Sequence, residues 1–131
     1  MQESAGIIIL NKNNKVLILR PSGYGNKIWS VPKGKIEKDE MPIDAAIRET
    51  EEEAGIKTDK DKLISLGIQT YKNKKKKVHL FLIKVEELDD DYIPNLNWEN
   101  DKFLWIDLEQ SMKLIHEAQI PFMEKIKELI K

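Results

Sequence analysis

Residues 34–56 read GKIEKDEMPIDAAIRETEEEAGI, and the rest of the chain is best interpreted outward from this stretch. Its second half predicts a helix from Pro42 to Ala54, because proline suits the first helical turn, where its missing N–H costs nothing. Gly55 suits the left-handed position that often ends a helix. The first part follows Pro32 and begins at Gly34, and both residues oppose a continuous helix, so we expect a loop there.

An apolar stripe and an acidic stripe emerge when the helix is drawn at about 100° per residue. The apolar stripe, expected to face the core, consists of Ile43, Ile47, Thr50 and Ala54. Glu49, Glu52 and Glu53 lie at i, i+3 and i+4 and share a second face. Ala45 and Ala46 flank that face and are expected to leave room for a bulky group. Three such carboxylates either form a solvated face or hold a hard divalent cation such as Mg²⁺, which prefers oxygen ligands.

The spacing of the whole stretch resembles the Nudix box, Gx5Ex7REUxEExGU, in which U is a bulky aliphatic residue. Gly34, Glu40 and the run from Arg48 to Ile56 match every fixed position. The one departure is Thr50, at an aliphatic position. Its methyl group can pack against the core, whereas its hydroxyl needs a hydrogen-bond partner in the helix or nearby.

This resemblance implies a hydrolase that uses Mg²⁺, or else Mn²⁺, to cleave a pyrophosphate bond in a nucleoside diphosphate linked to another moiety. Divalent ions neutralise phosphate charge and lower the pKa of a bound water. The implied metal ligands are the carboxylates of Glu49, Glu52 and Glu53 and the backbone carbonyl of Gly34. Glu40 is expected to orient ligands or water, and Arg48 to hold a carboxylate of the box. The general base stays open between Glu52, Glu53 and a later carboxylate.

Two further segments resemble the diadenosine-tetraphosphate hydrolases of this superfamily. Residues 29–34, WSVPKG, match their W-x-x-P-K-G approach to the box. Lys33 and Lys35 would then lie near the phosphates, and Lys33 favours a longer polyphosphate, since many triphosphate-specific members have glycine there. Glu99 precedes Trp105 by six residues. This resembles those enzymes, which have a glutamate in the loop before the last strand and a tryptophan inside that strand. Glu99 is therefore our candidate for the later carboxylate; the alternative is an ordinary loop residue.

Several residues outside these motifs have a structural and a functional interpretation. Arg20 ends a predicted strand and is either an edge residue or a phosphate contact. The lysines of residues 74–77 either extend a phosphate track or form a solvated turn. His79 is expected to be a structural histidine within a strand. The candidates for stacking on a nucleobase are Tyr24, Tyr71, Tyr92 and Trp98. Of these, Tyr71 is the preferred substrate-binding residue.

Apolar patterns elsewhere predict strands over 5–10, 16–20, 28–31, 63–71, 78–85 and 103–107. The first two strands should form a hairpin, and residues 78–85 are apolar on both faces, as in an interior strand. Amphipathic helices are expected over 108–116 and from Pro121 onward. With the resemblance, this order implies an α+β fold, a Nudix-type α/β/α sandwich around a mixed sheet. The length of 131 residues indicates a single Nudix domain over 1–131, with the box at 34–56.

The composition is that of an ordinary globular protein. The net charge is −1, which gives no global attraction to nucleic acid or to membrane surfaces, and nucleic acid is expected as a partner only as an RNA 5′ end. The chain has no cysteine, which excludes disulfides and thiolate sites. It shows neither a signal peptide nor an apolar run of about 20 residues, so we expect a cytoplasmic enzyme with no membrane partner. The oligomeric state stays open.

The preferred substrate is a dinucleoside polyphosphate such as diadenosine tetraphosphate. The alternatives within the superfamily are a MutT-type nucleoside-triphosphate pyrophosphohydrolase that removes modified nucleotides, an RNA 5′-pyrophosphohydrolase, and enzymes for nucleotide sugars or inositol pyrophosphates. The alternative from another class is a nucleotide-binding sensor with the same fold. The intact carboxylates Glu49, Glu52 and Glu53 argue against a sensor, which need not keep every metal ligand.

Overall fold

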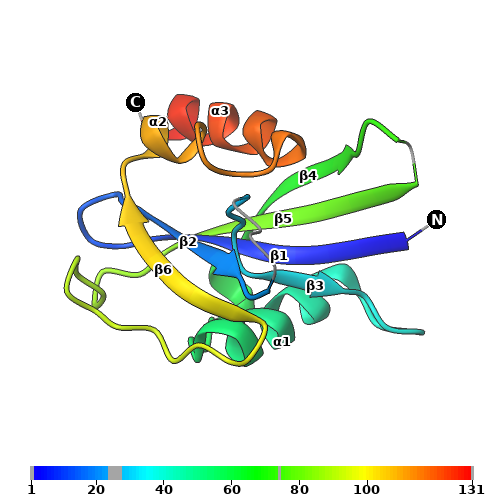
Figure 1. The fold of residues 1–131 in the computed structure, drawn as a ribbon, viewed down its shortest axis with the longest axis horizontal. Helices are drawn as coiled ribbons and strands as arrows, with labels where there is room; N and C mark the ends of the chain where they lie inside the picture. The colour runs from blue at the N-terminus through cyan, green and yellow to red at the C-terminus, as the bar shows by residue number, and fades with distance from the viewer. Residues whose placement is uncertain (1, 24–27, 74, 131) are drawn as a thin grey trace.

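A computed structural model describes residues 2–23, 28–73 and 75–130, and the structural statements below concern these residues. Figure 1 shows a central sheet with helices on both sides. In chain order the elements are β1 (Gln2–Leu10), β2 (Val16–Pro21), β3 (Lys33–Lys35), α1 (Pro42–Ala54), a 3₁₀ turn η1 (Lys60–Lys62), β4 (Ile64–Thr70), β5 (Lys76–Lys84), β6 (Asn100–Ile106), α2 (Leu108–Ser111), a 3₁₀ turn η2 (Glu117–Gln119) and α3 (Ile120–Leu129).

The sheet is mixed, and its main path runs in the order β4-β5-β1-β2-β6. β1 and β5 are parallel, whereas the pairs β1–β2, β2–β6 and β4–β5 are antiparallel. β3 lies off this path and pairs antiparallel with the first half of β1, through Ser4, Ala5 and Gly6. β1 is therefore the interior strand on which the sheet is assembled.

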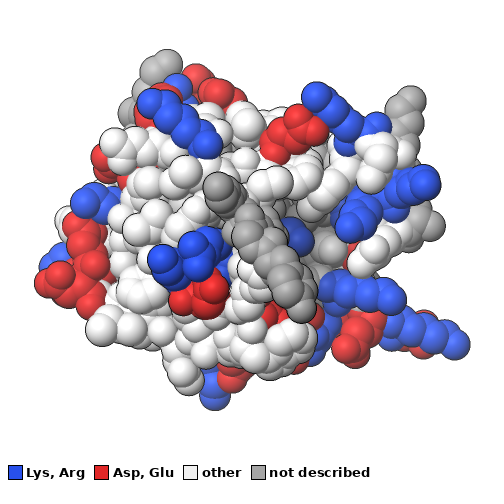
Figure 2. Space-filling model, in the orientation of Figure 1, with Lys and Arg blue, Asp and Glu red and all other residues white. Residues whose placement is uncertain are grey.

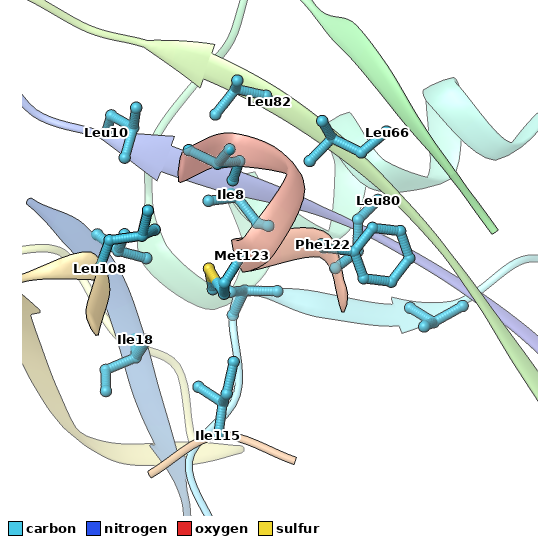
Figure 3. Close-up of a cluster of buried hydrophobic side chains, with 14 residues drawn as sticks. Ile8, Leu10, Ile18, Leu66, Leu80, Leu82, Leu108, Ile115, Phe122 and Met123 are labelled. Atoms are coloured by element: carbon cyan, nitrogen blue, oxygen red, sulfur yellow. The ribbon is translucent and has the colours of Figure 1, made fainter. Parts of the chain in front are cut away.

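The two faces of the sheet carry two separate cores, which explains why β1 reads as a continuous apolar run. Ile8 and Leu10 pack on the α3 side with Phe122 and Met123, as Figure 3 shows. Ile7 and Ile9 pack on the opposite side, in the cluster that includes the buried alanines of α1. Each fully buried isoleucine contributes about 1.5–3 kcal/mol relative to an exposed one. The predicted α+β fold, with helices on both faces of a mixed sheet, is confirmed.

The helix α1 has the predicted bounds, and Gly55 ends it at φ 68°. The predicted use of its faces is partly wrong. Ala45 and Ala46 are fully buried in the core beside β1 and leave no room for a ligand, because small side chains let the helix lie close to the sheet. The Thr50 hydroxyl is buried and has no hydrogen-bond partner among the described residues, contrary to expectation.

Several strands begin or end one to three residues from the predicted bounds, and two elements differ more strongly. Residues 28–31 form no strand; Trp29 and Ser30 make only isolated bridges, and the strand β3 forms at 33–35, where a loop was expected. Gly6 explains the shift, because a Cβ there would lie 2.2 Å from the Pro32 carbonyl oxygen and would prevent this close approach. The helix predicted over 108–116 ends at Ser111, since the backbones of Leu114 and His116 bond to Trp29 instead.

Across the described residues, no helix has both the length and the apolar character needed to cross a membrane.

Candidate active site

Arg48 joins the loop of the box to the helix α1. Its Nε and Nη2 donate to the two carboxylate oxygens of Glu40, both at 2.9 Å, and its Nη1 donates to Glu49 at 2.8 Å. Nη2 also donates to the carbonyl of Lys35 at 3.0 Å. The contact with Glu52 is longer, at 3.4 Å. Arg48 therefore acts chiefly on Glu40 and Glu49, and it fixes the loop that leads from β3 into the helix.

The hydrogen bonds from Arg48, with a smaller contribution from the Glu37 backbone, lower the pKa of Glu40 to about 2. Its ionised form therefore stabilises the fold above the ordinary carboxyl pKa, and this stabilisation is lost as the pH falls toward 2. We expect Glu40→Gln to lower the free energy of unfolding by about 1–2 kcal/mol at neutral pH. Urea denaturation should show that the difference in the free energy of unfolding between the wild type and Glu40→Gln becomes smaller between pH 5 and pH 3. The matched control is Glu37→Gln, because Glu37 is exposed. A difference between the wild type and Glu40→Gln that does not depend on pH would contradict the assignment.

Glu49 is buried at the junction of α1 and β3. A Cβ on Gly34 would lie 2.1 Å from the carboxyl carbon of Glu49, so only glycine at this position lets the carboxylate rest against the β3 backbone. Burial raises the pKa of Glu49, and the hydrogen bond from Arg48 opposes that shift. Gly34 and Glu49, both predicted metal ligands, are thus brought together by the fold.

Glu53 lies one turn further along α1 and is also buried. The side-chain amide of Asn100, at the start of β6, donates to its Oε1 at 3.1 Å. Burial, together with repulsion from Glu49 and Glu99, raises the pKa of Glu53 to about 8. In the absence of a cation Glu53 is therefore mostly protonated at neutral pH, and a bound cation would favour its ionised form.

The other carboxylates of the helix are more accessible. Glu52 is half exposed on the same face as Glu49 and Glu53. Glu51 points outward, as expected, and lies 3.8 Å from Lys57.

An acidic cavity of about 210 Å³ adjoins Glu53; among the described residues it is lined by Pro21, Ser30, Lys33, Glu53, Glu99 and Asn100. Glu99 precedes β6, and its backbone carbonyl accepts a hydrogen bond from Ser22 N–H at 2.8 Å. The loop of Glu99, remote in sequence from the box, thus reaches the carboxylates of α1.

The carboxylates suit a divalent cation in charge and in chemistry, since Glu53 is buried among like charges without a full counter-charge. Within the described ranges, no three acidic or histidine side chains converge as a closed metal site. Glu49 is instead engaged by Arg48. A cation held by Glu49, Glu52, Glu53 and the Gly34 carbonyl would therefore compete with Arg48 for Glu49.

An aromatic cavity of about 320 Å³ shares Pro21, Ser30 and Lys33 with the acidic cavity. Its other walls include Trp29, Tyr71, Lys76, His116 and Gln119. The rings of Tyr71 and His116 lie 4.6 Å apart between centroids. His116 Nδ1 accepts a hydrogen bond from the Ala118 N–H, so a neutral His116 carries its proton on Nε2. This cavity offers flat apolar rings next to two cationic side chains.

Lys33 stands between the two cavities. Burial lowers the pKa of its ammonium group, while the nearby charges of Glu53, Glu49 and Glu99 oppose that shift. Strand pairing sets Lys35 opposite Ser4 and Lys76 opposite Gln2, so β3 and β5 bring their lysines to the same end of β1. Figure 2 shows Lys and Arg side chains gathered at that end of the molecule. Lys74 lies outside the described residues.

Two predicted phosphate contacts are not brought to a cavity. Arg20 forms a paired contact with Asp101 on β6, at 3.0 and 3.1 Å, and lines neither cavity. The side chain of Lys35 is exposed, and it lines neither cavity.

The candidates for base stacking lie in different environments in the structure. Tyr71 lines the aromatic cavity, whereas the Tyr92 side chain packs in the α1-side core. The backbone carbonyl of Tyr92 accepts a hydrogen bond from the Trp105 indole at 3.0 Å. Trp98 is 84% exposed in the loop before β6. Tyr24 lies outside the described residues. His79 bonds to the Glu3 carboxylate at 2.8 Å, which fits the predicted structural role.

Sequence reasoning missed several residues that build the site. Gly6 permits the approach of β3, and a glycine within an apolar run was a usable signal. Asn100 holds Glu53, and His116 and Gln119 line the aromatic cavity. Nothing in the local sequence distinguishes these three from ordinary polar residues, since their roles depend on contacts across the fold.

Comparison with known proteins identifies the family of the chain. A model of the NUDIX domain matches residues 1–126, so the chain belongs to the Nudix family. It is 31% identical over 148 residues to an RNA pyrophosphohydrolase of Pelagibacter ubique, covering 100% of this chain and 92% of that protein. It is 34% identical over 122 residues to the m7GpppN-mRNA hydrolase of Saccharomyces cerevisiae, but covers only 12% of that protein and 89% of this chain. The crystal structure of a C. elegans Ap4A hydrolase binary complex superimposes with a TM-score of 0.79 at 26% identity, covering 99% of this chain and 98% of that one.

The chain is a Nudix pyrophosphohydrolase, an enzyme that hydrolyses phosphoanhydride bonds. Enzymes of this family act on nucleotide polyphosphates and generally use divalent metal ions, usually Mg²⁺.

Proposed function

We propose that this enzyme hydrolyses a dinucleoside polyphosphate of the diadenosine-tetraphosphate kind with Mg²⁺. The observation that carries the proposal is the pair of adjoining cavities that meet at Lys33. One cavity is lined by the carboxylates of Glu53 and Glu99, and the other by aromatic rings and a second lysine, Lys76. A ligand with a long phosphate chain and a nucleobase at its end matches both in chemistry.

The helix α1 would hold the cation through Glu49, Glu52 and Glu53, with the carbonyl of Gly34 from β3. Mg²⁺ supplies neutralisation of phosphate charge and activation of a water molecule when it is bound. Lys33 would bind the phosphate chain where the two cavities meet. Arg48 and Asn100 orient the carboxylates of Glu49 and Glu53, respectively.

The proton of the attacking water needs an acceptor. Glu52, Glu53 and Glu99 are the candidates, because each lies on the α1 face or at the acidic cavity. Glu99 is the candidate outside the helix: it lines the acidic cavity from the loop before β6. It therefore need not share a helix face with the metal ligands.

The nucleobase would occupy the aromatic cavity, where Tyr71 and His116 present adjacent rings. Stacking on such rings contributes about 1–3 kcal/mol per base and tolerates different bases. Lys76 on β5 would contact a phosphate that extends past Lys33. The C. elegans Ap4A hydrolase, whose structure superimposes over nearly all of the chain, supports this choice of substrate.

An RNA 5′ end is the second candidate. The similarity to the RNA pyrophosphohydrolase of Pelagibacter ubique favours it. So do the successive lysines Lys75, Lys76 and Lys77 at the start of β5 and just before it, of which Lys76 lines the aromatic cavity. Successive lysines can follow a phosphate backbone.

A hydrolysis screen with resolved products separates these functions. The panel consists of diadenosine polyphosphates, ordinary and oxidised nucleoside triphosphates, ADP-ribose and a 5′-triphosphorylated RNA, each with Mg²⁺, with Mn²⁺ and with a chelator. We expect ATP and AMP from diadenosine tetraphosphate, at a higher kcat/KM than for any other compound, and no turnover with the chelator. Faster release of pyrophosphate from a triphosphate or from RNA would retain the Nudix chemistry and reject the dinucleotide.

A further inference from the structure

We propose that Gln119 is a positioning residue that fixes the wall shared by the two cavities, formed by Ser30 and Lys33. Gln119 belongs to η2, on the far side of the fold from the carboxylates of α1, and the Nudix box does not include it. The inference rests on the proposed function to the extent that Lys33 binds polyphosphate.

The Gln119 side chain is fully buried and both ends of its amide are bonded. Its Oε1 accepts from the Val31 backbone N–H at 3.2 Å, and its Nε2 donates to Ser30 Oγ at 2.9 Å. Ser30 Oγ in turn donates to the Val31 carbonyl at 2.7 Å. Since that hydroxyl has one proton, it can only accept from Gln119, which fixes the orientation of the amide.

Segment 29–32, which leads into Lys33, is held by four different parts of the chain. Ser30 exchanges two backbone hydrogen bonds with Leu19 of β2, and Trp29 bonds to Leu114 and His116. The Pro32 carbonyl accepts from Ile7 N–H on β1. Between these backbone contacts, the buried Val31 N–H bonds to a side chain, that of Gln119. Gln119 thus provides the hydrogen-bond partner for a backbone group of this segment that does not pair with the sheet.

The segment that Gln119 supports contributes to both cavities. Ser30 and Lys33 line both of them, together with Pro21, and Gln119 itself lines the aromatic cavity. The metal-binding carboxylates have other supports, because Arg48 holds Glu49 and Asn100 holds Glu53. Loss of the Gln119 amide should therefore weaken polyphosphate binding and leave the chemical step nearly unchanged.

The test compares Gln119→Met, Lys33→Met and the double variant with the wild type in diadenosine-tetraphosphate hydrolysis. Methionine keeps the length of glutamine and removes its hydrogen bonds. We expect Gln119→Met to raise KM by about five- to tenfold with kcat changed by less than about twofold. In the Lys33→Met background it should raise KM by less than about twofold, because both changes remove the same interaction.

Ser111→Ala is the matched control, because it removes a buried hydrogen bond, to the Leu108 carbonyl, that does not involve segment 29–32. It should lower the melting temperature without changing KM. If Gln119→Met does not fold, Ser30→Ala replaces it, since it removes the acceptor of Gln119 Nε2. Independent, multiplying effects of Gln119→Met and Lys33→Met on KM would overturn the inference, as would a fall in kcat at constant KM.

Binding of inorganic tripolyphosphate, measured by calorimetry, makes the test independent of the nucleotide. A wild type that binds tripolyphosphate but does not hydrolyse diadenosine tetraphosphate refutes the proposed substrate alone. In that case Gln119→Met should still weaken tripolyphosphate binding by about five- to tenfold, and again not in the Lys33→Met background. Unchanged binding in Gln119→Met, or no binding to the wild type, overturns the role assigned to Gln119.

Discussion

Glu53→Gln is expected to lower kcat by about a thousandfold while the fold is retained. The substitution keeps the size of the side chain and the acceptor oxygen that bonds to Asn100. It removes the negative charge that a divalent cation requires at the centre of the site. Steady-state kinetics on the best substrate of the screen, with circular dichroism to check the fold, measures this effect.

Two comparisons make the Glu53→Gln result specific. Glu51→Gln is the matched control, because it is the same change on the exposed side of the same helix, and it should leave kcat within about twofold of the wild type. A similar decrease of kcat in both variants would indicate a general effect on the helix α1. Retained activity in Glu53→Gln would remove Glu53 from the metal site.

Glu53→Gln should also stabilise the metal-free protein in alkaline solution. The pKa of Glu53 is raised to about 8, so the folded protein keeps a proton that the unfolded chain releases near 4.5. Stability therefore falls as the pH rises from 4.5 to 8, and Glu53→Gln removes this fall. With a chelator present, the free energy of unfolding of Glu53→Gln should exceed that of the wild type by on the order of a few kcal/mol at pH 9. The difference should shrink toward zero at pH 4.5.

Glu52→Gln is expected to lower kcat by about a hundredfold or more, with the fold again retained. Glu52 is half exposed and makes only a long contact with Arg48, so the change costs little packing. A fall in kcat, together with a higher Mg²⁺ concentration for half-maximal activity, would distinguish a lost metal ligand from a disturbed helix. Unchanged hydrolysis would remove Glu52 from the ligand set.

The helix α1 could be predicted from sequence with its bounds, because Pro42 and Gly55 mark its ends through local backbone chemistry. The buried strands β1 and β2 could be predicted as well, since their apolar runs reflect burial on both faces. The Nudix box identified the family. In the structure Glu49 lies against Gly34 and accepts a hydrogen bond from Arg48.

The features of the fold and the site that could not be predicted depend on contacts between residues far apart in the sequence. Ala45 and Ala46 face the core and not the ligand, because the distance between the helix and the sheet decides their burial. The short strand β3 exists because Gly6 lets Pro32 approach β1. Gln119 acts through two hydrogen bonds, across 88 and 89 residues of chain, and Asn100 acts through one across 47 residues. No local pattern encodes such partners.

The pairing of β1 also affects how the chain folds during its synthesis. β1 precedes every other described strand, yet its parallel partner β5 ends only at Lys84. A ribosome that adds about 5–20 residues per second would expose the apolar run Ile7–Leu10 for several seconds before that partner emerges. The nascent protein therefore presents a binding segment for a chaperone during this interval, and pauses in translation before Lys84 should increase its aggregation.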